Sequence, residues 1–354
     1  MHNYPYITIA GRKIGLDYSP YIIAELSANH NGRIENALKL VEQAKIVGAD
    51  AIKLQTYTAD TITLNSDDED FQIKGGLWDG TTLYKLYQQA AMPWEWHKIL
   101  FECAFKNDIT IFSSPFDSTA VDLLEDLNAP AYKIASFEAI DLPLIRYVAS
   151  TGKPMIISTG MADADEISEA IEAARSGGCK ELAILHCVSG YPAPAEDYNL
   201  RTISDMINRH SLVTGLSDHT LDNTTAITSV ALGASIIEKH FTLDRSGGGP
   251  DDSFSLEPEE MKQLCEGTKT AWAAIGNVDY GRKSSEKGNV QFRRSLYFVE
   301  PLSKGDIITR ESVRSVRPGF GLAPKFIDEI IGREVNSDIK INSPVKWEDI
   351  QPYE

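Results

Sequence analysis

Eight short apolar, β-favouring segments alternate with amphipathic helical stretches between about residue 20 and residue 275. Each segment begins with apolar residues and ends with polar or charged ones. The segments begin at residues 21, 51, 109, 131, 154, 182, 211 and 234. The stretches between them follow the 3.6-residue helical period, as in residues 36–44, where Leu40, Val41 and Ala44 share one face. Eight β-then-α units predict a closed (β/α)8 barrel of the TIM type. A doubly wound sheet is the alternative, but it does not require polar residues after every strand.

The chain is long enough for one large domain and one small one. We predict a barrel domain over residues 1–280, a polar linker over residues 281–292 and a separate domain over residues 293–354. A tail of about 60 residues is marginally stable alone, so we expect it to pack on something else. Inside the barrel domain, residues 60–93 are too long for an ordinary connection and contain many aromatic side chains, which favours an active-site loop or lid over a disordered insertion.

Charge and apolar content exclude several classes of partner. The formal net charge of −17 argues against nucleic acid and anionic membranes, which need an excess of Lys and Arg. No run approaches the 18 apolar residues of a membrane span. Cys103, Cys179, Cys187 and Cys265 are scattered without a CxxC pair, which indicates reduced thiols and a cytoplasmic setting.

Two histidines end the last two predicted strands: His219, in residues 215–220, and His240, in residues 236–242. Neighbouring parallel strands lie roughly 4.8 Å apart, so two imidazoles at adjacent strand ends can share one divalent ion. A pair of buried, hydrogen-bonded histidines is the simpler interpretation, but a barrel places its chemistry at these strand ends. Two histidine ligands also leave positions for water or a substrate carbonyl, as a Lewis-acid site requires.

Lysines, carboxylates and hydroxyl groups follow the other predicted strands. The set comprises Glu25, Lys53, Gln55, Ser113, Ser114, Lys133, Ser136, Glu138, Ser158 and Ser217. One lysine at a strand end is most simply part of a salt bridge, but two lysines beside several serines suit a phosphate-bearing anion. Glu25 and Glu138 can serve as acid or base, with pKa values moved by burial and by the lysines. Cys187 has no activating partner in the sequence and is interpreted as a small packing residue.

At these strand ends the chain resembles the sialic acid synthase family. The matching motifs occur in the family's order over nearly the whole chain, at residues 22–32, 53–56, 113–116, 132–136, 158–161, 215–220 and 238–241. The tail resembles the family's antifreeze-like (SAF) domain, with residues 316–319 as its signature. Residues 25–30, 74–79, 254–257 and 317–322 are most similar to the branch of the family that makes pseudaminic acid.

The resemblance implies a metal-dependent transferase that condenses phosphoenolpyruvate with 2,4-diacetamido-2,4,6-trideoxy-L-altrose and releases phosphate by C–O cleavage. N-acetylneuraminate or legionaminate synthesis from another N-acetylated hexose is the alternative. The implied catalytic residues are Glu25, Lys53, Lys133 and Glu138. Phosphoenolpyruvate would bind Lys53, Ser114, Lys133, Ser136, Ser158 and Ser217, and the sugar would bind Gln55, Glu138, Tyr191, Asp251 and Arg317.

The resemblance also implies a cofactor and a partner. A divalent cation would bind His219 and His240, with Mn²⁺ expected and Mg²⁺ or Co²⁺ as alternatives. The chain would form a domain-swapped homodimer in which Arg317 completes the partner's site.

Two interpretations from other functional classes account for only part of the chain. An aldolase with a Schiff-base lysine accounts for Lys133 but not for the two histidines. A carbohydrate-binding or ice-binding module accounts for the tail but gives the barrel mouth no role.

Overall fold

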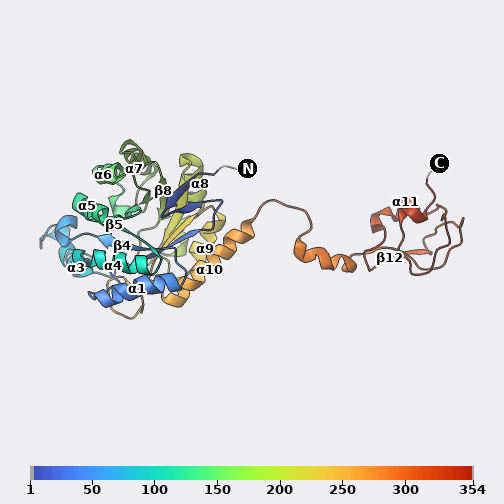
Figure 1. The fold of residues 1–354 in the computed structure, drawn as a ribbon, viewed down its shortest axis with the longest axis horizontal. Coiled ribbons are helices and arrows are strands. Elements are labelled where there is room, and N and C mark those ends of the chain that lie inside the picture. Colours follow the sequence, from blue (N-terminus) through green and yellow to red (C-terminus); the bar gives the residue numbers. More distant parts are fainter. Residues whose placement is uncertain (1–3, 353–354) are drawn as a thin grey trace. The chain divides into compact units, whose positions relative to one another are not determined.

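The computed structural model describes residues 4–352, and the chain divides into two compact units, residues 1–276 and 277–354 (Figure 1). The first unit is a closed barrel in which all eight strands run parallel and β10 pairs with β3. This closure confirms the predicted barrel and rules out a doubly wound sheet, which has two free edges. The barrel strands are β3 (Tyr21–Glu25), β4 (Ala51–Thr56), β5 (Thr110–Pro115), β6 (Tyr132–Ile134), β7 (Met155–Ser158), β8 (Leu182–Cys187), β9 (Val213–Asp218) and β10 (Ile236–His240).

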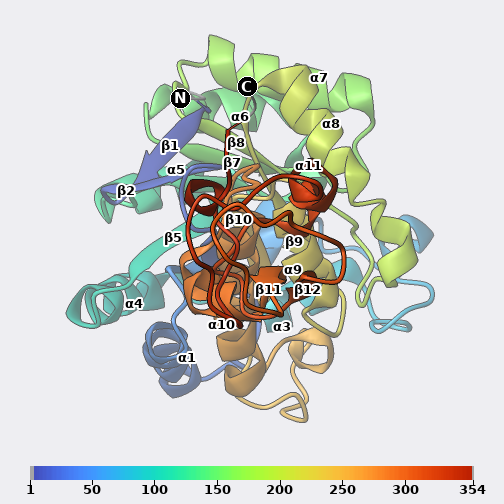
Figure 2. The ribbon, with the colours of Figure 1, turned by 90° about the vertical axis from the view of Figure 1, so that its right-hand side faces the viewer.

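Helices surround this barrel (Figure 2). The predicted apolar face of α1 is buried at Leu40, Val41 and Ala44, because residues three or four apart meet on one side of a helix. Helix α7 begins with a capping box between Asp163 and Glu166. The helices of this unit are α1 (Ile34–Ile46), α2 (Ala59–Ile62), α3 (Leu83–Ala90), α4 (Trp94–Lys106), α5 (Ser118–Asp126), α6 (Leu142–Ser150), α7 (Ala164–Ser176), α8 (Arg201–His210), α9 (Thr224–Ala231) and α10 (Pro258–Ile275).

A hairpin that the strand pattern did not predict closes one end of the barrel. Strands β1 (Tyr6–Ile9) and β2 (Arg12–Gly15) pair antiparallel (Figure 2). Ile7, Ile9 and Ile14 join one buried cluster with residues from the amino ends of the barrel strands, such as Tyr21 and Ile236. The hairpin therefore seals the amino-terminal end, and the chemistry is confined to the carboxyl-terminal end.

The last two barrel strands extend further than the apolar runs indicated. The apolar runs beginning at residues 211 and 234 stop before the polar residues, but β10 ends at His240, as predicted, and β9 ends at Asp218, one residue before His219. The reason is pairing with neighbours: Ser217 is in register with Cys187, and His240 with Glu25. Backbone hydrogen bonding thus carries both strands into their polar residues.

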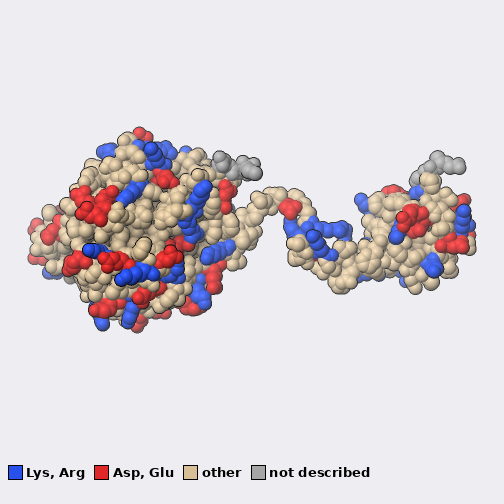
Figure 3. Space-filling view, viewed as in Figure 1, with Lys and Arg blue, Asp and Glu red and all other residues tan. Residues whose placement is uncertain are grey.

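The second unit has its own small core. Strands β11 (Ser295–Phe298) and β12 (Val313–Val316) pair antiparallel, and α11 covers Ile327–Ile330. Their buried side chains pack with Ile308, Val335, Ile339, Val345 and Ile350. The preceding 3₁₀ segment, Ser284–Phe292, buries no residue, and Lys and Arg side chains gather on this stretch of chain (Figure 3).

Within residues 4–352 no helix is both long and apolar enough to cross a membrane, and all four cysteines are free thiols.

Candidate active site

Both predicted lysines lie inside the barrel in one charged cluster. Lys53 and Lys133 are only 3% and 2% exposed. Lys53 Nζ lies 2.6 Å from Glu25 Oε2 and donates to Ser114 Oγ at 3.1 Å. Lys133 Nζ donates to Glu238 Oε1 at 2.9 Å, and the same oxygen lies 3.8 Å from Lys53 Nζ. Two cations and two carboxylates therefore share one buried volume at the carboxyl ends of the strands.

The pKa values of the two carboxylates in this cluster are shifted in opposite directions. Burial acts to raise the pKa of Glu238, but Lys133 and Lys53 outweigh it and hold that pKa below its usual value. Burial raises the pKa of Glu25 to about 7. The negative charge of Glu238 acts in the same direction, and the positive charge of Lys53 acts against it. Burial acts to lower the pKa of Lys53, yet the two carboxylates raise it. Burial lowers the pKa of Lys133 although Glu238 opposes this. Two lysines thus lie beside one carboxylate whose pKa is lowered, an arrangement suited to an anionic substrate.

Glu238 was not among the predicted site residues. It lies two positions before His240 on β10, and alternate residues of a strand point to the same face. Applying that period to the strand ending at His240 would have placed Glu238 in the barrel interior.

Hydroxyl groups line the same interior. Ser217 Oγ donates to Glu238 Oε1 at 3.4 Å, and Ser136 Oγ accepts from the Gly160 amide at 3.2 Å. Ser158 Oγ and Ser189 Oγ are buried without a protein partner among the described residues. A Cβ on Gly160 would lie 2.3 Å from Ser189 Oγ and 2.7 Å from Ser136 Oγ, so these two hydroxyl groups can lie this close to residue 160 because it is glycine. Buried hydroxyl groups without a protein partner, such as those of Ser158 and Ser189, are suited to bind a polar ligand.

The two predicted histidines are adjacent, with ring centroids 5.4 Å apart. His219 Nδ1 donates to the Val188 carbonyl at 2.8 Å, and the ring also forms a hydrogen bond with Cys187. Burial, and then the charge on His219, lower the pKa of His240 well below its usual value, and its Nδ1 has no hydrogen-bond partner. The unpaired Nδ1 of His240, beside the ring of His219, fits a divalent cation. The described residues group no third His, Cys, Asp or Glu with them, so water or substrate would fill the remaining positions.

A buried ion pair behind the histidines sets their separation. Lys239 Nζ donates to Asp218 Oδ2 at 2.6 Å and to the carbonyls of Thr220 and Asp222 at 2.7 Å each. Lys239 and Asp218 are in register across β10 and β9, and each directly precedes one of the histidines. The pair therefore ties together the two strand ends that carry the imidazoles.

The interpretation of Cys187 as a residue without a partner was wrong. Burial acts to raise the pKa of Cys187, but a hydrogen bond with His219 reverses the effect and lowers it. Burial likewise acts to lower the pKa of His219, and the contact with Cys187 raises it instead. This contact joins residues 32 positions apart, and the local sequence pattern does not reveal it.

The residues predicted to face the sugar, apart from Arg317, line one cavity of about 470 Å³ together with His240. Asp251 Oδ2 accepts from Ser27 Oγ at 2.5 Å and lies 3.9 Å from His240 Nδ1. Gln55 Nε2 donates to Glu25 Oε1 at 2.9 Å. The Tyr191 ring lies 4.3 Å from that of His219, centroid to centroid.

Arg317 belongs to the second unit, where it follows β12 directly and is exposed. No ion pair or side-chain hydrogen bond joins it to the described residues of its own chain.

The Glu138 carboxyl supplies a test of this site by pH. Burial, as the largest cause, raises its pKa to about 7 from 4.5. The protonated form is thus favoured in the folded state, and this advantage is lost as pH rises through 7. We expect Glu138→Gln to raise the free energy of unfolding at pH 8 by roughly 1–2 kcal/mol, discounted for partial solvation, with little change at pH 5 and with loss of activity.

Urea unfolding at both pH values measures the effect of Glu138→Gln. The exposed Glu169 on α7 provides the control, Glu169→Gln. Equal stability changes at pH 5 and pH 8 would contradict the raised pKa.

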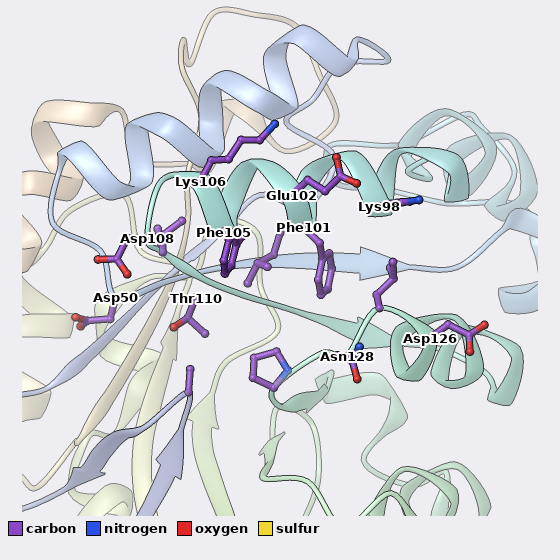
Figure 4. Close-up of a pocket in the computed structure, with 15 residues that line it drawn as sticks. Asp50, Lys98, Phe101, Glu102, Phe105, Lys106, Asp108, Thr110, Asp126 and Asn128 are labelled. Carbon is purple, nitrogen blue, oxygen red and sulfur yellow. The ribbon is translucent and has the colours of Figure 1, made fainter.

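A larger hollow, about 760 Å³, lies at the other end of the barrel strands (Figure 4). Phe101 and Phe105 on α4 line it together with Lys98, Glu102 and Lys106 of the same helix (Figure 4). It contains none of the predicted site residues. Volume alone therefore does not identify the site; the buried charge cluster does.

Comparison with known proteins agrees with this geometry. A family model described as the NeuB family matches residues 40–280, about two thirds of the chain. The chain belongs to the NeuB family. A SAF domain model matches residues 293–351, so the NeuB barrel is followed by the predicted antifreeze-like domain.

Among NeuB-family relatives, the pseudaminic acid synthase of Campylobacter jejuni is 45% identical over 335 residues, covering 95% of this chain and 98% of that protein. The pseudaminic acid synthase of Helicobacter pylori is 44% identical over 94% of this chain and 98% of its own length. The crystal structure of N-acetylneuraminic acid synthetase from Leptospira borgpetersenii superposes with a TM-score of 0.73 at 30% identity, covering 82% of this chain and 98% of that one.

Proposed function

We propose that this chain condenses phosphoenolpyruvate with 2,4-diacetamido-2,4,6-trideoxy-L-altrose to form pseudaminic acid and phosphate. The observation that carries the proposal is the 45% identity, over 95% of the chain, to a pseudaminic acid synthase. The buried Lys53–Lys133 pair supports it, because an anion with phosphate and carboxylate charges needs such a site. N-acetylneuraminate or legionaminate synthesis is the alternative, and it differs only in the sugar.

In the proposed reaction, C3 of phosphoenolpyruvate attacks the aldehyde carbon of the open-chain sugar, and positive charge develops at C2. Water adds to C2, and the tetrahedral intermediate loses phosphate together with the bridging oxygen, by C–O cleavage. Lys53, Lys133 and Ser114 would hold the phosphate and carboxylate, with Ser136, Ser158 and Ser217 as further donors. Glu25, whose pKa of about 7 allows both protonation states, is suited to take the proton of the attacking water.

On the sugar side, Gln55, Glu138, Tyr191 and Asp251 would orient the open chain. Glu138, with its pKa also about 7, is suited to exchange a proton with the sugar oxygen. A divalent cation held by His219 and His240 would polarise the aldehyde.

Metal removal should abolish turnover. Excess EDTA is expected to stop phosphate release, and added Mn²⁺, or Mg²⁺ or Co²⁺ less well, should restore it. His240→Ala removes one of the two imidazoles and should not be rescued at ordinary metal concentrations. Lys98→Ala, in the hollow at the opposite end of the barrel, is the control and should behave as wild type. Full activity in excess EDTA would remove the metal from the mechanism.

Substrate choice tests the proposed function directly. The protein is incubated with phosphoenolpyruvate, Mn²⁺ and one sugar at a time, and released phosphate is measured. Phosphate release should be fastest with 2,4-diacetamido-2,4,6-trideoxy-L-altrose. N-acetylmannosamine should be poor, since a site built for a second acetamido group leaves its polar contacts unpaired when that group is absent. Faster turnover of N-acetylmannosamine would move the chain to the neuraminate branch.

The same proposal includes a cytoplasmic setting and a domain-swapped homodimer in which Arg317 reaches the partner's barrel. An exposed arginine that pairs with none of the described residues of its own unit is consistent with such an exchange.

A further inference from the structure

One wall of the active-site cavity is apolar. It is formed by side chains of residues 62–87, the segment predicted from its length to be an active-site loop. The wall consists of Ile62, Ile73, Trp78, Leu83, Leu86 and Tyr87, all partly buried. The polar side chains of Gln55, Glu138 and Asp251 line the same cavity. A sugar in this cavity would therefore meet both polar groups and hydrocarbon.

Hydrogen bonds hold this wall in a defined shape. The Ile73 amide donates to the Thr81 carbonyl at 2.9 Å, and the Gly80 amide donates back to the Ile73 carbonyl at 3.2 Å. Trp78 Nε1 donates to the Pro250 carbonyl at 3.2 Å, which ties the segment to the loop that carries Asp251. The wall is preformed, so it can discriminate between ligands without first being ordered.

The position of the wall points to the far end of the sugar. The reacting aldehyde carbon must lie near His219, His240 and the lysine cluster inside the barrel. The remaining carbons then project outward into the cavity, toward the apolar side chains. The end of the chain most distant from the aldehyde is C6.

We propose that this wall, Ile62, Ile73, Trp78, Leu83, Leu86 and Tyr87, selects sugars that carry a methyl group rather than a hydroxymethyl group at C6. The inference rests on the proposed function and adds the residues that determine specificity. A methyl group gains from contact with hydrocarbon, whereas a hydroxyl group there loses its water without a replacement hydrogen bond. An apolar pocket of this kind discriminates against an added hydroxyl by roughly tenfold to a hundredfold.

The test compares two sugars that differ by one oxygen atom: 2,4-diacetamido-2,4,6-trideoxy-L-altrose and its 6-hydroxy counterpart, 2,4-diacetamido-2,4-dideoxy-L-altrose. The wild-type kcat/KM should be at least about tenfold higher for the 6-deoxy sugar. Ile73→Thr and Leu86→Asn place polar groups on the wall and should each reduce this ratio, mainly by raising KM for the 6-deoxy sugar. The controls are Leu64→Asn and Leu77→Thr, on the same segment but 67% and 49% exposed and not part of the wall.

Equal kcat/KM for the two sugars in the wild type would overturn the inference. So would an unchanged ratio in Ile73→Thr and Leu86→Asn whose thermal unfolding matches that of the controls. If one variant does not fold, the other decides, because the two positions lie on different parts of the segment. Absence of phosphate release with every sugar would instead overturn the proposed function itself.

Discussion

Lys133→Ala should lower kcat/KM for phosphoenolpyruvate by at least about a hundredfold, on the order of 3 kcal/mol. The change removes one of two buried cations from the proposed anion site. It also leaves Glu238 without the partner that its Oε1 contacts at 2.9 Å. The remaining cluster, Lys53 with Glu25 and Glu238, then has too little positive charge to attract a phosphate and a carboxylate.

The variant also carries a risk to folding, because an unpaired buried carboxylate is costly. The double variant Lys133→Ala, Glu238→Gln removes that charge and should recover thermal stability without recovering phosphoenolpyruvate affinity. Lys153→Ala, which breaks an ion pair with Glu125 on a partly exposed part of the barrel, is the control. Affinity is measured by calorimetry. Unchanged phosphoenolpyruvate affinity in a folded Lys133→Ala protein would refute the anion site.

The barrel and the centre of the site could be predicted because each βα unit carries its own sequence signal. A closed parallel barrel collects the carboxyl ends of all its strands on one face. Lys53, Lys133, His219 and His240 are far apart in sequence, yet each lies within a recognisable strand or directly after one. Knowing the strands is therefore enough to bring these side chains together.

What could not be predicted depends on contacts that no local pattern records. Ser27, which was not among the predicted site residues, bonds to Asp251 across 224 positions, and Asp251 itself was expected only from the family resemblance, because it lies in a loop without periodicity. The β1–β2 hairpin has only four residues in each strand, too few for alternation to be distinguished from chance. Glu238 differs from these cases, because the two-residue period of β10 places it on the same face as His240. The sequence pattern is therefore sufficient to predict that Glu238 lies inside the barrel.

The second large effect is expected in a mixture of two inactive proteins. Arg317 is exposed and has no ion pair or side-chain hydrogen bond with the described residues of its own unit, and the proposed exchange would place it over the partner's barrel. Glu25→Gln and Arg317→Ala homodimers should each be nearly inactive. In a mixed dimer formed by reciprocal two-fold exchange, one active site contains both substitutions and the other contains neither. Random pairing makes about half of the dimers mixed, so co-refolding equal amounts should restore roughly a quarter of wild-type activity.

This recovery distinguishes a site shared between chains from one built within a chain. If Arg317 served the barrel of its own chain, every site in the mixture would carry one defect, and no pairing would produce an intact site. Arg310→Ala, which breaks an exposed ion pair with Asp328 in the same small unit, is the matched control and should leave the homodimer active. Heterodimer formation must be verified with differently tagged chains. Heterodimers without activity would place Arg317 in its own chain's site or outside the site, because reciprocal exchange necessarily creates one complete site per mixed dimer.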